Sequence, residues 1–148
     1  MSIQNQYQRI SFTEIAEKVR EEPGIYEIWT ESGSRLKVGI SKNLRKRLKQ
    51  HAASRDSGLK GLDSNPTEPA HITSKASILA KHLYFDRALD EARGYNLRSG
   101  KERKNFLAEK CYIKFLVTKT RDEARRLEIE MEKSGEFRYT REVRIIEE

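Results

Sequence analysis

Several features are scarce in this sequence of 148 residues, and each scarcity excludes a class of protein. The single cysteine, Cys111, excludes an internal disulfide bond and a zinc site built from several cysteines. No apolar run approaches the roughly 18 residues that a membrane helix needs, and the first residues lack the apolar stretch of a signal peptide. No internal repeat or linker divides the chain. We therefore expect one domain over residues 1–148, a cytoplasmic location and no membrane partner.

The composition is densely ionic, because charged residues and apolar residues each make up 36% of the chain. The formal net charge is +7 and the isoelectric point is about 9.5. Acidic residues are absent between Arg35 and Arg55, where eight lysines and arginines gather. Such a stretch indicates a surface that faces a polyanion, for which a nucleic acid is the first candidate.

This basic stretch belongs to a predicted strand, turn, strand and helix over residues 23–51. Two runs rich in β-branched and aromatic residues, Gly24–Thr30 and Leu36–Ile40, flank a polar loop and predict a hairpin. Ser41 then offers a helix cap, and apolar residues recur at helical spacing from Leu44 to Ala52.

The remaining segments give a coarser prediction. Residues 1–10 are polar, and we expect them on the surface; Ser11 and Glu14 match a capping box that opens a helix continuing past Val19. The later elements expected are a loop over residues 54–72, a helix over 74–93, a loop over 95–105, a strand over 111–118, a helix over 122–133 and a final strand from Phe137. His82 lies among apolar residues, and we expect an ordinary helix side chain there and not a metal ligand.

Two tripeptides and two helices carry a resemblance to a known family. Gly24-Ile25-Tyr26, Lys37-Val38-Gly39, the Arg47 and His51 pair, and the helix bearing Glu128 resemble, in order and spacing, the GIY-YIG nuclease family. The sequence departs from the family in two places. Lys37 replaces the tyrosine of the second tripeptide, and no asparagine occupies the expected position near Thr140.

The resemblance implies a fold and an activity. The fold is α+β, with a small, mainly antiparallel sheet of three to four strands flanked by helices. The family core would cover residues 23–53 and 110–133, with a helical and loop insertion at about 54–109. The activity is hydrolysis of DNA phosphodiester bonds with Mg²⁺ or Mn²⁺ as cofactor, leaving 5′-phosphate and 3′-hydroxyl ends.

The same resemblance implies the roles of five candidate catalytic residues. Tyr26 would orient or deprotonate the attacking water, Glu128 would hold the metal ion, and Arg47 would bind the phosphate. A phenol has a pKa near 10, so Tyr26 needs a neighbouring cation to favour phenolate, and Lys37 is a plausible source that could also contact the phosphate. His51 lies four residues after Arg47, hence on the same helical face, where it could bond Tyr26 or carry a proton.

Other basic residues predict a surface that binds nucleic acid without reading sequence. The candidates are Lys42, Arg45, Lys46, Lys49, Arg98, Lys101, Arg103 and Lys104. RNA is a weaker candidate than DNA, since no aromatic-rich RNA signature is present. No separate DNA-reading segment is visible, which leaves target specificity to the insertion or to a protein partner. The alternative, favoured by the change to Lys37, is a binding module on this fold that has lost catalysis.

Overall fold

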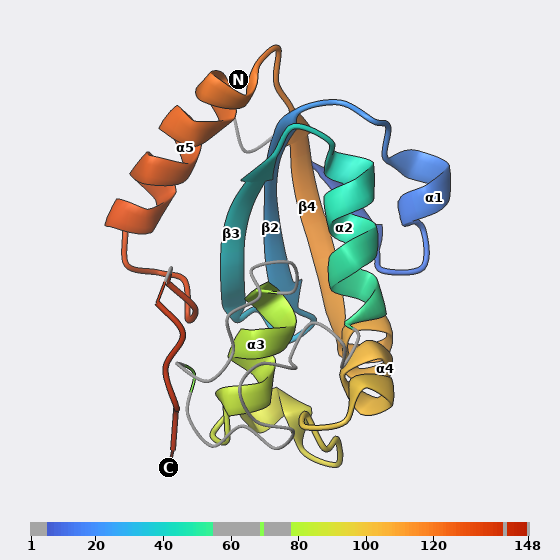
Figure 1. Cartoon of the computed structure of the whole chain (residues 1–148), viewed down its shortest axis with the longest axis vertical. Helices are drawn as coiled ribbons and strands as arrows, with labels where there is room; N and C mark the ends of the chain where they lie inside the picture. The colour runs from blue at the N-terminus through green and yellow to red at the C-terminus, as the bar shows by residue number, and fades with distance from the viewer. Residues whose placement is uncertain (1–5, 55–68, 70–77, 141, 148) are drawn as a thin grey trace.

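A four-stranded antiparallel sheet forms the centre of the molecule, in the strand order β1-β4-β2-β3 (Figure 1). The computed structural model describes residues 6–54, 69, 78–140 and 142–147. Helices cover both faces of the sheet, with α2 (Leu44–Ala53) on one and α5 (Arg121–Lys133) on the other. The predicted α+β fold with a small antiparallel sheet is confirmed.

The predicted hairpin forms between β2 (Gly24–Thr30) and β3 (Arg35–Ser41). The register pairs Tyr26 with Gly39 and Ile28 with Lys37, and a bulge follows at Trp29. Gly33 takes a φ of 102° in the connecting turn, a conformation that glycine adopts without steric cost. Helix α2 follows within a few residues, and its N-cap is Asn43, which accepts a hydrogen bond from the Lys46 amide, instead of the predicted Ser41.

Two strands complete the sheet, and one of them corrects the sequence prediction. Strand β4 (Cys111–Val117) matches the predicted strand, and it lies in the interior between β2 and β1. Strand β1 (Gln8–Ser11) was expected to be a surface segment without structure. It is polar because it is an edge strand, and only Ile10 is buried in the core.

Alternation along the strands divides the core into two apolar layers. Tyr26, Ile28 and Phe115 point to the face where Leu44 and Leu48 of α2 pack. The residues between them point the other way, toward α5. Ile25, Val38, Leu116, Ala124 and Leu127 belong to that second layer. Neighbouring residues of β2 therefore serve two different faces of the sheet.

Three helices differ from the prediction. Helix α1 (Ile15–Lys18) is a single turn, because Val19 already takes an extended conformation. Of the two hydrogen bonds of the predicted capping box, the one that the Ser11 amide donates to the Glu14 side chain is present. Helix α4 (Gly100–Lys110) occupies the predicted loop at 95–105, with the Ser99 side chain as its cap. Helix α3 (Ile78–Phe85) is shorter than predicted, and only the 3-10 turn η4 (Asp90–Ala92) follows it.

The predicted final strand is absent from the described residues after α5. A single bridge joins Ile146 to Asp86, at the point where α3 ends. Beside it, Arg138 donates two hydrogen bonds to the Asp86 carboxylate, at 2.6 and 2.9 Å, and the Tyr139 hydroxyl donates another at 2.7 Å. We call these three residues the Asp86 clasp. It fastens the C-terminal segment to the residues that follow α3.

Two further predictions concern single features. Cys111 is buried as predicted, and burial raises the pKa of its thiol, which keeps it protonated and unreactive. In the described part of the chain, no helix has the length and apolar character needed to cross a membrane. The division into a family core and an insertion stays a prediction, because most of residues 54–77 lie outside the described part.

Candidate active site

Tyr26 lies at the centre of the candidate site, and the sheet register explains its position. It stands on β2 between Gly39 of β3 and Phe115 of β4. Its ring covers Gly39 so closely that a Cβ atom added there would lie 2.4 Å from the phenolic oxygen. The glycine of the second tripeptide therefore makes room for the tyrosine of the first.

His51 approaches the same hydroxyl from α2. Leu44, Leu48 and His51 recur at helical spacing and are all buried, so one face of α2 carries them toward the sheet. The Nε2 atom of His51 lies 2.7 Å from the Tyr26 hydroxyl oxygen. The other ring nitrogen, Nδ1, is buried without a hydrogen-bond partner among the described residues.

Burial sets the protonation of this pair. The enclosed environment raises the pKa of the Tyr26 phenol, while the Arg47 cation, through its charge and a hydrogen bond, acts in the opposite direction. Burial also lowers the pKa of His51 far below 6.5, with the charges of Arg47 and Lys37 adding to the effect. Both groups are therefore neutral near pH 7, and a single proton is shared across their hydrogen bond.

Arg47 and Lys37 supply positive charge from two different elements. Arg47 is half-buried on α2, one turn before His51, and donates to Gln50 at 3.3 Å. Lys37 is only 7% exposed and, paired with Ile28, points to the same face as Tyr26. The predicted action of Lys37 on Tyr26 stays a prediction. Arg47 lowers the pKa of Tyr26 against the effect of burial, and the charge of Lys37 adds to burial in lowering the pKa of His51 and of His82.

His82 is a residue of the site that sequence reasoning missed. It lies on α3, is 2% exposed, and stacks on the Tyr139 ring with 4.9 Å between ring centroids. Burial and the charge of Lys37 lower its pKa to about 3, and its own charge would lower that of His51. No motif marked this residue, since α3 belongs to the predicted insertion; its apolar surroundings gave the only hint.

Glu128 is buried at 8% exposure, but its helix approaches from the other side. Ala124 and Leu127 of α5 pack on Ile25 and Val38, in the layer that Tyr26 does not face. Helix α5 lies beside the edge strand β3, away from α2 (Figure 1). The Glu128 charge nevertheless raises the pKa of Tyr26, so the two groups influence each other electrostatically. Its role as metal ligand stays a prediction.

The predicted nucleic-acid surface is confined to fewer residues than the sequence suggested. The exposed candidates are Lys42, Lys46, Lys49, Arg98, Lys101 and Lys104. Arg45 is half-buried and donates a hydrogen bond to the Ala16 carbonyl. Arg103 is fully buried, and its guanidinium donates to Ser54 Oγ, the Ser54 carbonyl and the Leu97 carbonyl. Arg103 therefore ties α4 to the end of α2 and is withdrawn from the predicted surface.

Comparison with known proteins identifies the segment that holds most of these residues. Residues 22–77 match the model of the GIY-YIG catalytic domain. The predicted resemblance to the GIY-YIG nuclease family is confirmed over this segment. The matched segment contains Tyr26, Lys37, Arg47 and His51, and it ends before Glu128.

Two solved structures are also similar to this chain. Both are the GIY-YIG N-terminal endonuclease domain of UvrC from Thermotoga maritima. One is bound to its catalytic divalent cation, magnesium. The other is an asparagine-to-alanine point mutant bound to its catalytic divalent cation. Each is 19% identical to this chain. The TM-scores are 0.43 and 0.44, and the matches cover 86% and 88% of this chain and 92% and 93% of theirs. No curated protein matches this sequence. The resemblance therefore rests on the match of residues 22–77 to the family model and not on these structures.

Proposed function

We propose that this protein is a divalent-metal-dependent endonuclease that hydrolyses phosphodiester bonds in DNA. The observation that carries this proposal is the 2.7 Å contact between the Tyr26 hydroxyl and His51 Nε2. It lies beside Arg47 and within the segment that matches the GIY-YIG catalytic domain. A buried phenol bonded to a neutral imidazole forms an acid–base pair next to a cation that can hold a phosphate.

The Tyr26–His51 pair activates the attacking water. The phenolic oxygen takes a proton from water while its own proton passes to Nε2 of His51, so the phenol ends the step neutral. The imidazole is a weak base in the free protein, because burial and two cations hold its pKa down. A phosphate bound at Arg47 and Lys37 offsets those cations and makes His51 a better proton acceptor. Substrate binding thereby switches the base on.

Arg47 and Lys37 bind the scissile phosphate in different ways. A guanidinium can donate two parallel hydrogen bonds to the non-bridging oxygens, which fixes the orientation of the phosphorus toward Tyr26. Lys37 supplies a compact charge from β3, in the position where the family has a tyrosine. Together they stabilise the negative charge that grows on the oxygens in the transition state.

Glu128 is the residue that would hold the divalent ion. A single carboxylate with a shell of waters suits Mg²⁺, which keeps several waters when it binds to proteins. The donor chemistry fits, since Glu128 is a largely buried carboxylate whose charge reaches Tyr26. No cluster of three or more His, Cys, Asp or Glu side chains suited to a metal occurs among the described residues. A bound divalent ion would neutralise charge on the phosphate and stabilise the leaving oxygen.

Cleavage assays test the proposal directly. Plasmid, linear, branched and single-stranded DNA are incubated with the protein and Mg²⁺ or Mn²⁺, with EDTA as the control. Cleavage that EDTA abolishes is expected, with 5′-phosphate ends on the products. Tyr26→Phe and Arg47→Lys should each lower the rate by about 10² or more. Tyr95→Phe, which removes a hydroxyl bonded to Glu109 outside the site, serves as the matched control and should cleave normally.

A separate binding assay distinguishes an enzyme from a binding module. Glu128→Gln should abolish cleavage and leave DNA binding equal or tighter, because a negative charge beside the phosphates is removed. Binding should weaken steeply with salt, as for any contact built from lysines and phosphates. If no DNA is cut with either metal while binding persists, the domain has lost catalysis and the proposal is wrong.

Two remaining expectations belong to this proposal. Target choice would come from the insertion or from a protein partner. A cytoplasmic location, expected from the single reduced cysteine, would place the enzyme with its DNA substrate.

A further inference from the structure

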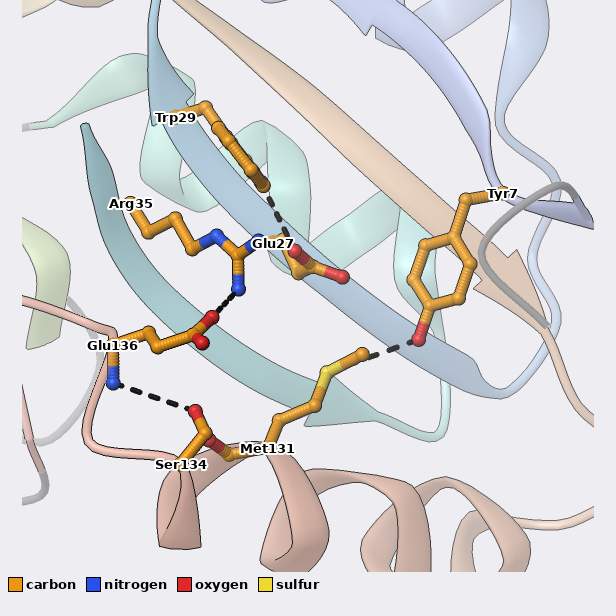
Figure 2. A network of polar contacts seen from close by, with 7 residues as sticks. All are labelled: Tyr7, Glu27, Trp29, Arg35, Met131, Ser134 and Glu136. Carbon is orange, nitrogen blue, oxygen red and sulfur yellow. Dashed lines mark hydrogen bonds and ion pairs between the residues drawn. The ribbon is translucent and has the colours of Figure 1, made fainter. Parts of the chain in front are cut away.

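A second pocket lies on the face of the sheet that Tyr26 does not occupy. It has a volume of about 300 Å³ and is lined by β2, β3, α5 and the residues directly after α5. Figure 2 shows this region, with Glu27 on the sheet and Met131 on the helix facing it. Because Glu27 and Tyr26 are neighbours on β2, they point to opposite faces. The pocket therefore lies on the other face of the sheet from Tyr26 and His51, although its α5 wall also carries Glu128.

Glu27 is the unusual residue of this pocket, since it is a carboxylate residue that is only 1% exposed. One oxygen accepts a hydrogen bond from the Trp29 indole at 3.0 Å. The other oxygen, Oε2, has no hydrogen-bond partner among the described residues. In Figure 2 it points away from Trp29, toward the side where Tyr7 and Met131 meet. A buried carboxylate oxygen left unsatisfied is costly, and a cationic donor would offset that cost.

The charges around the pocket favour a cationic occupant. Its lining includes three glutamates, Glu27, Glu130 and Glu136, against one cation, Arg35. Arg35 is already paired with Glu136, which leaves Glu27 and Glu130 facing the space. Burial and the negative charge of Glu27 together raise the pKa of the Tyr7 phenol, so the charge of this carboxylate also acts on a neighbouring side chain outside the pocket lining. The chain as a whole has a net charge of +7, but the negative charge of this pocket repels the phosphates of a nucleic acid.

The remaining walls fit an aliphatic stem. Leu127 and Phe137 are apolar, and Met131 is a flexible side chain that adapts to varied shapes. The volume lies at the lower end of the range for ligand pockets, which suits one long side chain. A stem lying against these residues would deliver a charged head to Glu27. Arginine and lysine bury their stems in this way while the charged head finds a polar partner.

We propose that this pocket binds the guanidinium or ammonium group of an arginine or lysine side chain presented by a protein partner. The acidic lining selects a cationic side chain and excludes DNA, and the apolar walls hold its methylene groups. Since Tyr26 points to the other face, the partner and DNA can be bound together. A partner docked here would hold the nuclease without covering Tyr26 and His51.

The only tryptophan of the chain, Trp29, reports directly on this site, since its indole N–H donates to Glu27. The 148-residue chain, labelled with ¹⁵N, is titrated with blocked arginine (N-acetyl-arginine methylamide) while the single indole signal is followed by NMR. We expect a saturable shift of that signal. The citrulline analogue, which has the same shape without the charge, should bind at least about tenfold more weakly.

Glu27→Gln is the matched variant, because glutamine keeps an oxygen for Trp29 and removes only the charge. It should lower the affinity for blocked arginine about tenfold or more. Glu130→Gln, at an exposed position, provides a second variant that should also weaken binding if Glu27→Gln does not fold. An equal response to citrulline, or unchanged affinity in both variants, overturns the proposal.

Agmatine separates a protein side chain from a small free cation. It carries the same guanidinium on an aliphatic stem but has no peptide groups. If the natural occupant is an arginine within a protein, the blocked amino acid should bind at least as tightly as agmatine. A clear preference for agmatine would assign the pocket to a small organic cation and refute the assignment to a protein partner.

Discussion

Replacing Gly39 by alanine should disable the candidate site through one added carbon atom. The new Cβ would lie 2.4 Å from the Tyr26 hydroxyl oxygen and 2.5 Å from the ring carbon that bears it. Ordinary contacts require a separation of about 3.5 Å, so the tip of the ring must move by about 1 Å. The bond to His51, now 2.7 Å, cannot survive such a shift without movement of α2.

The expected magnitudes follow from this displacement. Overpacking of this kind costs about 1 to 3 kcal/mol, and the reduced flexibility of the unfolded chain returns about 0.4 to 1 kcal/mol. The net loss in the free energy of unfolding should therefore lie between about 0 and 2.6 kcal/mol. A misplacement of about 1 Å in a catalytic group lowers the rate by about 10². Urea unfolding and DNA cleavage measure the two effects.

A double-mutant cycle isolates the contact between the two residues. In a Tyr26→Ala background the ring is gone, and Gly39→Ala should keep only the gain of about 0.4 to 1 kcal/mol from the less flexible unfolded chain. The coupling energy should therefore equal the overpacking cost, about 1 to 3 kcal/mol. If Gly39→Ala is as stable and as active as the parent, Tyr26 does not depend on the space above Gly39, and the geometry described for the site is wrong.

Three other predictions concern buried charges around the site. The folded-state pKa of His82, about 3, lies below its unfolded value near 6.5, so the protein should lose stability as the pH falls from 6.5 toward 3. Between pH 6 and 4 the loss in the free energy of unfolding should be about 2 to 3 kcal/mol. Urea unfolding of His82→Gln should not show this dependence of stability on pH. Arg103→Lys should lower the free energy of unfolding by about 2 to 4 kcal/mol, because one ammonium cannot donate to all the acceptors at Ser54 and Leu97. The salt dependence of its DNA binding should stay unchanged. The matched variant Lys104→Ala should show a shallower salt dependence in a filter-binding assay and an unchanged stability by calorimetry. Lys37→Met should raise the pKa of His51 and move the acid limb of the cleavage pH profile to higher pH; an unmoved limb would show that Lys37 does not act through the histidine.

The elements with strong local signals could be predicted from the sequence. The β-rich runs of β2, β3 and β4 and the helical spacing of α2 and α5 gave elements within a residue or two of those observed. The edge strand β1 and the helix α4 were not predicted, since β1 is polar and the large apolar side chains that α4 buries are only Phe106 and Leu107. Helix α3 was predicted too long because its end depends on the Asp86 clasp, which joins residues about fifty positions apart.

In the site, too, residues close in the sequence could be predicted, and residues brought together only by the tertiary fold could not. Tyr26, Arg47 and His51 could be found because they lie on adjacent elements with fixed spacing. His82 and Tyr139 could not, since only the tertiary fold brings them beside Lys37. The wrong assignment of Arg103 has a similar cause: a basic residue on a polar segment looks exposed until the fold buries it against Ser54.

The position of β4 has a consequence for the order of events during synthesis. Its central place in the sheet means that β2 has only one neighbour until the ribosome has made residues 111–117. At about 5 to 20 residues per second, the roughly seventy residues between Ser41 and Cys111 take about 4 to 14 s to add. During that interval the nascent chain exposes an unpaired edge of β2, which invites association with chaperones or neighbouring chains. A nuclease built in this way should remain inactive until translation of its domain is nearly finished.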